Sequence, residues 1–401
     1  MQASSGWKNT ITEWDNRFPL ILVGVLIGLI WYTTGEHAGA HAHHVLHSHG
    51  AHFVSNHLLM WIFFAFLGNE ITLRSITQAG KFVGLATLGG MLVPPILTYL
   101  FTGNIFIAIG AAATDVAFSV GASKMLTKGD AKVLSLMVTA LLILAVGDDL
   151  GGIVIMAGMY TSDVSQGWLM TEVFVLAFTY FCGERGVVDF TVQESGKPDT
   201  KRHYQWVVEI RSVCFWWLLA AANTYVLYMA GVEWILGGCL AFLMAPPSVQ
   251  HRIEHVLKPV IPLVLFVFGM VNGAIDVLAP ASWGLMTAGC LFGGMLGKQL
   301  GIFGGGTLGR HWCRNDQGVK YAAIPTRQIY SMAMLGSCNG TVAIFFVAMA
   351  LAKGKITEVE AAQATLGYFL TVPAVYLQAM VVKALGLVQD VPEFQPDEPT
   401  A

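Results

Sequence analysis

Apolar runs long enough to cross a lipid bilayer recur from one end of the sequence to the other. Each run approaches the roughly 20 residues that a membrane-spanning helix needs. Only 12% of the 401 residues are charged, whereas a soluble domain usually has about 25%. The sequence therefore predicts an all-α polytopic membrane protein, in which each charge inside an apolar run needs a reason.

The apolar runs predict about twelve transmembrane helices. They cover about 18–32, 57–79, 83–101, 105–125, 132–158, 168–182, 205–229, 233–247, 259–277, 281–303, 327–352 and 362–387. Lysine and arginine concentrate in the loops on one side of these spans, and the loops on the other side have almost none. Because basic loops favour the cytoplasmic side, we expect both termini in the cytoplasm and the first loop outside.

The first external loop, residues 35–57, is rich in histidine. Imidazole is a good ligand for zinc and similar metals, so the loop is a candidate metal site. A solvated segment of low complexity explains the same residues, because no cysteine or repeated acid completes a ligand set. Both interpretations stay open, and we expect no cofactor.

Three aspartates, Asp115, Asp148 and Asp149, lie in the middle of apolar runs. A charge at the centre of a membrane span costs roughly 2.5–3.5 kcal/mol, so acids in such places usually have a function. Lys298 is the one basic residue that is buried in a comparable run. These four residues are the strongest candidates for a functional site.

Asp148 and Asp149 are adjacent, so their side chains point roughly 100° apart on a helix. One carboxylate then faces an aqueous cavity, while the other packs inward and needs a cationic partner. Lys298 is the membrane-embedded candidate for that partner. Because a buried charge left alone would be neutralised by gaining or losing a proton, the pair predicts a proton switch.

Two tracts of small or polar residues interrupt the apolar spans, GAAATD at 110–115 and GSCNGT at 336–341. Paired interruptions in two halves of a transporter indicate broken helices and a binding site near the bilayer midplane. Facing helix N-termini would leave positive charge for Asp115 to offset, and facing C-termini would leave negative charge for Lys298. Close packing of small residues is the alternative explanation for either tract alone. The second tract supplies four residues of the expected break: Gly336, Asn339, Gly340 and Thr341.

Other charged residues are weaker candidates. Glu70 is either a regulatory residue at the cytoplasmic mouth or an interfacial helix end. Glu254 and His255 fall in a predicted cytoplasmic loop, where a solvated charge competes with pH sensing, because histidine titrates near neutrality. Glu172 is interpreted as an anchor at the membrane interface.

Five motifs stand in one order over roughly residues 55–387: AATDVAF at 112–118, DDLG at 148–151, RIEHVLKP at 252–259, GKQLG at 297–301 and the pair Gly340-Thr341. Together they resemble the NhaA family of bacterial sodium/proton antiporters. Some positions depart from the family pattern. Where the family has a basic-basic-acidic cluster after Glu70, this chain has Thr72, Leu73 and Arg74. Gly147 replaces a bulky aliphatic residue, which would loosen the site.

The resemblance implies an inverted repeat with two broken, crossing helices. Residues 83–158 and 281–387 would form the two core repeats, and 159–280 would form a panel that makes a homodimer. The external loop would be a hairpin that bridges the two copies. The other implied segments are a cytoplasmic start at 1–17, two membrane helices with the histidine loop at 18–82 and an acidic cytoplasmic tail at 388–401.

The resemblance also implies a role for each site residue. Asp149 would be the main carboxylate for sodium and protons. Asp148 would be its neighbour at the cation, paired with Lys298 in one state of the cycle. Asp115 and Thr114 would lie at the helix crossing, opposite Lys298.

The expected function is exchange of cytoplasmic sodium or lithium for external protons in the bacterial inner membrane, serving pH homeostasis and salt tolerance. A hard cation and a proton compete for the same carboxylates while the site opens to each side in turn. If Asp149 and the Asp148–Lys298 pair each carry a proton, more protons than sodium ions move per cycle and transport is electrogenic. The expected partners are the bilayer, these ions and a second copy of the chain, without nucleic acid.

Two other functions use similar residues. An intramembrane aspartyl protease needs one aspartate on each of two facing helices, as Asp115 and Asp148 offer, although it has no need for a buried lysine. A potassium-selective exchanger or a sodium-coupled symporter would share the broken helices. Only the ions that it moves would tell such a protein apart.

Overall fold

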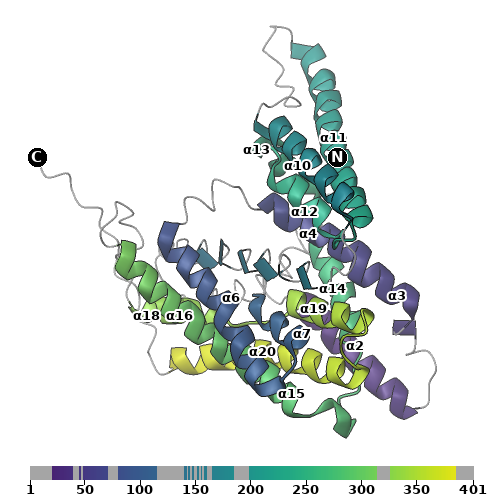
Figure 1. The fold of residues 1–401 in the computed structure, drawn as a ribbon. Coiled ribbons are helices and arrows are strands. Elements are labelled where there is room, and N and C mark those ends of the chain that lie inside the picture. The colour runs from purple at the N-terminus through teal and green to yellow at the C-terminus, as the bar shows by residue number, and fades with distance from the viewer. Residues whose placement is uncertain are drawn as a thin grey trace, which may run out of the picture.

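The computed structural model contains helices and no strand among the residues that it describes (Figure 1). These are residues 20–38, 45–46, 48–70, 80–114, 140–141, 143–144, 147–148, 151–152, 155, 158–159, 165–184, 198–313 and 326–384. Asp115 and Asp149 lie outside the described residues, as do the predicted terminal segments 1–17 and 388–401.

The helices of the first half are α2 (Leu20–Ala38), α3 (His49–Phe53), η2 (Val54–Leu59), α4 (Met60–Glu70), α6 (Gly80–Thr102), α7 (Ile105–Ala108), η3 (Ile109–Ala112) and α10 (Gln166–Glu184). Those of the second half are α11 (Pro198–Ala230), α12 (Leu236–Leu243), α13 (Pro247–Leu257), α14 (Ile261–Asn272), η4 (Pro280–Ser282), α15 (Leu285–Ala288), η5 (Gly289–Gly293), α16 (Gly294–Cys313), α18 (Thr326–Leu335), α19 (Thr341–Ala352) and α20 (Glu358–Ala384). η2 and η5 are π-helical turns, and η3 and η4 are 3₁₀ turns.

Local sequence explains where several helices begin. Gly103 has a φ of +66°, which lets the chain turn sharply after α6. The Asn104 side chain then accepts a hydrogen bond from the backbone N–H of Phe106 at 3.0 Å and caps α7. At α20, the Thr357 hydroxyl accepts from the N–H of Glu360, whose carboxylate accepts from the N–H of Thr357 at 2.7 Å. This reciprocal pair is a capping box.

Four helical segments within the described ranges are long and apolar enough to cross a membrane: Gly50–Asn69, Phe82–Thr102, Arg211–Ala230 and Glu358–Val382. Val249–Leu257 and Ile261–Asn272 add a fifth if this pair, bent by 52°, is counted as one span. The chain is therefore a multi-pass helical protein. The number of twelve spans stays a prediction.

One group of helices, which we call the core bundle, comprises α6, α7, η3, α15, η5, α16, α18, α19 and α20. Its closest contact is between α6 and α16, which run side by side (Figure 1). A Cβ atom on Gly301 would lie 2.1 Å from the carbonyl oxygen of Gly89. A Cβ on Gly297, one turn earlier, would meet the backbone of Pro94 at 2.5 Å, and one on Gly305, one turn later, the carbonyl of Leu85 at 2.1 Å. This glycine stripe lets the two backbones touch.

A second group, which we call the panel, comprises α2, α4, α10, α11, α12, α13 and α14. α2 packs on α14, α4 on α12, and α11 on both α10 and α12. Aromatic side chains join the panel to the core bundle, since the ring of Phe64 in α4 lies 5.7 Å from that of Phe345 in α19. The inverted repeat and the dimer role of the panel stay predictions.

The histidine segment differs from the predicted loop. His49–Leu59 is helical and runs directly into α4, so this part of the segment is not a hairpin. The ring of His57 stacks on Trp234 at 5.6 Å, which makes it part of an aromatic contact. Among the described residues, no three His, Cys, Asp or Glu side chains come together as metal ligands. A metal site in the rest of the segment falls outside the described residues.

The segment around Glu254, predicted as a cytoplasmic loop, forms the helix α13, and its side of the membrane stays a prediction. Proline at its first position pre-sets the backbone for a helix. Val249, Ile253 and Leu257 recur every four residues and are all buried, which gives the segment one apolar face. The polar residues between them hid this spacing from a search for uniformly apolar runs.

Candidate cation site

The first helical run of the predicted crossing ends just before Thr114. The 3₁₀ turn η3 ends at Ala112, and Ala113 is extended, with φ −73° and ψ 140°. The Thr114 side chain is 1% exposed, and its hydroxyl donates to Oδ2 of Asp148 at 2.7 Å. The carbonyl oxygen of Gly336 lies 3.2 Å from the same hydroxyl. Thr114 therefore joins the first unwound segment to the second one and to a buried carboxylate.

The second break lies between α18, which ends at Leu335, and α19, which begins at Thr341. Thr371 of α20 holds the unwound backbone, because its hydroxyl lies 2.9 Å from both the N–H and the carbonyl oxygen of Asn339. Gly340 precedes α19 without a side-chain cap. A Cβ on Gly336 would lie 2.9 Å from Ile302 of α16, so the segment packs tightly on the core bundle.

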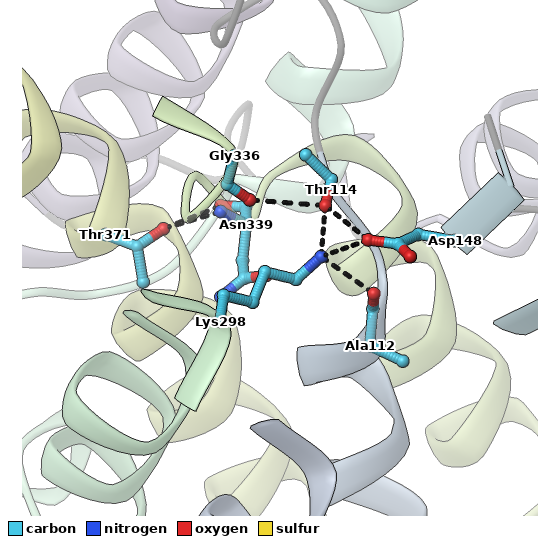
Figure 2. Close-up of polar contacts among 7 residues, drawn as sticks. All are labelled: Ala112, Thr114, Asp148, Lys298, Gly336, Asn339 and Thr371. Atoms are coloured by element: carbon cyan, nitrogen blue, oxygen red, sulfur yellow. Dashed lines mark hydrogen bonds and ion pairs between the residues drawn. The ribbon is translucent and has the colours of Figure 1, made fainter. Parts of the chain in front are cut away.

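Lys298 of α16 is completely buried and makes an ion pair with Asp148, Nζ to Oδ2, at 3.0 Å (Figure 2). Its Nζ also donates to the carbonyl oxygen of Ala112 at 2.7 Å and to the hydroxyl of Thr114. Three acceptors therefore surround the three N–H bonds of the ammonium group. Figure 2 shows that these acceptors converge on the end of the lysine side chain.

The charges of the helix ends explain why a lysine lies here. η3 ends at Ala112, and α18 ends just before Gly336, so two helix C-termini meet at the crossing. The carbonyl groups of a C-terminus carry about half a negative charge per helix. The Lys298 ammonium binds one of these carbonyls directly. The described residues thus contain the facing C-termini that were expected beside Lys298, whereas Asp115, expected at the facing N-termini, lies outside them.

Asp148 is completely buried, and only one of its two oxygens is satisfied. Oδ2 accepts from both Lys298 and Thr114, whereas Oδ1 has no hydrogen-bond partner in the structure described here. A free carboxylate oxygen beside carbonyls at helix ends is the kind of hard oxygen ligand that alkali cations accept. The next residue in the chain, Asp149, lies outside the described residues.

Gly147 does not leave the site loose as its size suggested. A Cβ on this residue would lie 3.0 Å from the Thr87 methyl group, so α6 already fills the space. Gly90 of the same helix is also close to the ion pair, since a Cβ there would lie 3.4 Å from Oδ2 of Asp148. The wall of the site beside Asp148 is thus made by α6.

The remaining predicted residues divide into two sets. Asn339 lies in the second break, with its side chain completely buried, and Thr341 is the first residue of α19. Glu70 is the last residue of α4, in the panel. Glu254 and His255 lie on α13, which packs on α4 and α11, and Glu254 makes an exposed ion pair with Lys258 at 3.0 Å. The structure does not bring these panel residues to the Asp148–Lys298 pair.

Sequence reasoning missed a polar chain beside the site. Gln299, next to Lys298, donates to the side-chain oxygen of Gln378 in α20 at 2.8 Å and to the Ser337 hydroxyl at 3.3 Å. Gln378 in turn donates to the Tyr330 hydroxyl at 3.2 Å. These side-chain hydrogen bonds connect α16, α18 and α20 with the second break. Lone glutamines in apolar spans were its signal in the sequence.

The interpretation of Glu172 as an interfacial anchor is wrong. The residue is 3% exposed, and neither carboxylate oxygen has a hydrogen-bond partner within the described structure. It shares a helix face with Trp168, whose ring lies 6.2 Å from that of Tyr225 in α11. Glu172 therefore points into the contact between α10 and α11.

Comparison with known proteins places this arrangement among transporters. The sequence model of the family described as Na+/H+ antiporter 1 matches residues 29–382. The Na+/H+ antiporter NhaA of Serratia proteamaculans is 30% identical over 315 residues, which cover 73% of each chain. Na+/H+ antiporter NhaA 1 of Clostridium beijerinckii is 28% identical over 72% of this chain and 70% of its own.

A solved structure supports the fold. The sodium proton antiporter MjNhaP1 from Methanocaldococcus jannaschii, determined at pH 8, superposes with a TM-score of 0.51. The match covers 91% of this chain and 90% of that one, at 11% sequence identity. At this identity the likeness concerns the fold alone.

Proposed function

Because this chain belongs to the Na+/H+ antiporter 1 family, we propose that it exchanges cytoplasmic sodium or lithium for external protons at the Asp148–Lys298 crossing. Its relatives are named as antiporters, which are transporters and not enzymes, so the protease alternative is set aside. The observation that carries the proposal is one completely buried ion pair, held beside the C-terminal ends of η3 and α18.

The proposed site binds either a cation or protons. Asp149 is the main carboxylate, and the free Oδ1 of Asp148 supplies a second oxygen. Thr114 and the carbonyls at the helix ends supply neutral oxygens, and Asp115 offsets charge at the crossing. Sodium and lithium prefer such oxygen ligands, but a protonated carboxyl is a poor ligand. Binding of a proton and binding of a cation therefore exclude each other.

The ion pair makes the exchange electrogenic. When a cation attracts Asp148, the Lys298 ammonium loses the carboxylate that stabilises its charge in a fully buried place. The Lys298 ammonium then releases a proton. Together with the proton that Asp149 releases, this gives two protons for each cation. Lys298→Gln then lowers the number of protons per cycle, and the voltage response of transport falls with it.

The division of the fold supports alternating access. Both breaks and the ion pair belong to the core bundle, and the panel contributes none of these residues within the described part of the chain. Movement of the core bundle against the panel would expose the site to one side at a time. The panel would then be the fixed part, anchored in the bacterial inner membrane as a homodimer, with both termini in the cytoplasm.

The test uses the purified full chain in proteoliposomes with an imposed proton gradient. Sodium, lithium and potassium are added in turn, and recovery of the internal pH is recorded. We expect sodium and lithium to dissipate the gradient in the wild type, and Asp149→Asn to abolish this response. Glu172→Gln is the matched control, because it replaces the carboxyl of another buried acid, which lies in the panel.

Three results would contradict the proposal. Sodium-dependent pH recovery that survives in Asp149→Asn would remove the carboxylate from the mechanism. A response to potassium alone would favour a potassium-selective exchanger. Cation uptake that carries protons in the same direction would identify a symporter.

A further inference from the structure

The side chain of Asn339 is completely buried at the second break, and it makes no hydrogen bond with any described residue. Neither Oδ1 nor Nδ2 has a partner in the structure as described. Buried polar side chains almost always have partners, so each exception calls for a reason. Its backbone is not free, because the Thr371 hydroxyl holds both the N–H and the carbonyl of the same residue. The amide is therefore held in place without a partner of its own.

The position of this amide relates it to Lys298. A Cβ on Gly294 would lie 2.4 Å from Nδ2 of Asn339, so the amide rests directly on α16 at that glycine. Lys298 follows Gly294 by one helical turn, and the two residues share a face of the helix. Side chains on a helix lean toward its N-terminus, which carries the lysine chain back over this turn. In the view of Figure 2, the Asn339 side chain overlaps the carbon chain of Lys298.

The chemistry of an amide suits a displaced lysine. In the present state the ammonium has Asp148, Ala112 and Thr114 as acceptors. A cation that binds Asp148 removes one of them, and the buried ammonium then needs a replacement. The Asn carbonyl accepts from an ammonium, and the Asn NH₂ donates to a neutral amine. An amide therefore serves the lysine before and after it loses a proton, which a carboxylate would not.

We propose that the Asn339 side chain is the position to which the Lys298 amine moves when a transported cation displaces it from Asp148. The proposal rests on the proposed function, since it requires a cation at Asp148. Asn339 is a positioning residue in this scheme. It stabilises the cation-bound state by giving the displaced amine a partner, and it does not itself touch the cation.

The test is cation binding to the purified full chain, measured by titration calorimetry with sodium and with lithium. Asn339→Leu keeps the branching and the number of heavy atoms of the side chain and removes both polar atoms. We expect the affinity for each cation to fall about tenfold, the factor that corresponds to about 1.4 kcal/mol. In the Lys298→Met background the same substitution has no further effect, because there is no amine to receive.

Asn339→Ser is a second variant, which retains a donor and an acceptor in a smaller side chain. We expect its affinity to lie between those of the wild type and of Asn339→Leu. If the Asn339→Leu variant fails to fold, Asn339→Ser takes its place, both alone and in the Lys298→Met background.

The outcomes separate the possible roles of the amide. An unchanged affinity in Asn339→Leu means that the amide only fills space, and it overturns the proposal. An equal loss with and without Lys298 means that the amide binds the cation directly, which also overturns it. Failure of the proposed function looks different, because the wild type itself would then bind neither cation, or Asp149→Asn would bind both as well as the wild type.

Discussion

Two buried carboxyl groups in this molecule have opposite surroundings. Asp148, in the core bundle, is completely buried and has Lys298 and Thr114 on one oxygen. Glu172, in the panel, is 3% exposed and has no partner on either oxygen among the described residues. An isolated charge in an apolar contact is very costly, so an uncharged carboxyl is the favoured state of Glu172. A paired carboxylate is able to keep its charge and to exchange its partner.

The difference indicates that burial alone does not distinguish the proposed site from another buried acid. Both residues are acids inside apolar spans, where an ionisable side chain is costly and usually marks a function. Of the two, only Asp148 lies where two helices end and where a buried ammonium group, that of Lys298, is held by hydrogen bonds. Substitutions that change the partners of these two carboxyl groups, or the helix packing around them, test this difference.

The largest effect on stability is expected from Lys298→Met. The substitution leaves Asp148 buried without its cation, and breaking a buried pair in this way costs about 3–5 kcal/mol. The unfolding midpoint in detergent should therefore fall well below that of the wild type. Adding Asp148→Asn should recover part of the loss, because the uncompensated charge is then gone. A midpoint that stays at the wild-type value would mean that the pair does not stabilise the core bundle.

A smaller effect is expected from the glycine stripe of α16. Gly301→Ala places a Cβ 2.1 Å from the carbonyl oxygen of Gly89, and backbone atoms cannot move aside locally. We expect a loss of about 1–3 kcal/mol from overpacking. Thermal unfolding of both variants in the same detergent measures the effect.

The matched control is Gly304→Ala on the same helix. A Cβ there meets nothing within 4 Å, so alanine should stabilise the helix by about 0.5–1 kcal/mol. Equal effects of the two substitutions would show that the close contact between α6 and α16 is absent in the membrane protein.

The smallest effect is expected from Glu172→Gln. Replacing a carboxyl group that has no hydrogen-bond partner by an amide of the same shape should change stability by less than about 1 kcal/mol. Exchange in proteoliposomes should stay at the wild-type rate. A loss of exchange would give the panel carboxyl a part in transport and would remove the contrast with Asp148.

The sequence was sufficient to propose the central pair. Lys298 was the one basic residue predicted to be buried in an apolar run, so Asp148 had one candidate partner, and the structure has the two side chains 3.0 Å apart. Glycine, serine and asparagine in an otherwise apolar span also indicated where α18 would stop. These features are local, and composition reveals them directly.

Other features depend on tertiary contacts that no local pattern contains. The carbonyl of Ala112 binds Lys298 through the backbone, which any residue would supply. Glu172 was misread because its burial depends on which face of α10 meets α11. The partners of Gln299 and Gln378 come from helices that are far apart in sequence. The residues before His57 were predicted as a loop although they are helical, because their histidines interrupt the apolar run that would indicate a membrane helix.

The most direct test of the account is proton release on cation binding. The purified chain is placed in detergent with very little buffer, and the pH is followed while sodium chloride is added. We predict that the wild type releases protons in proportion to bound sodium, that choline chloride releases none, and that Asp149→Asn is silent. Sodium binding by the wild type without any proton release would contradict the claim that the two ions compete for the same buried carboxylates.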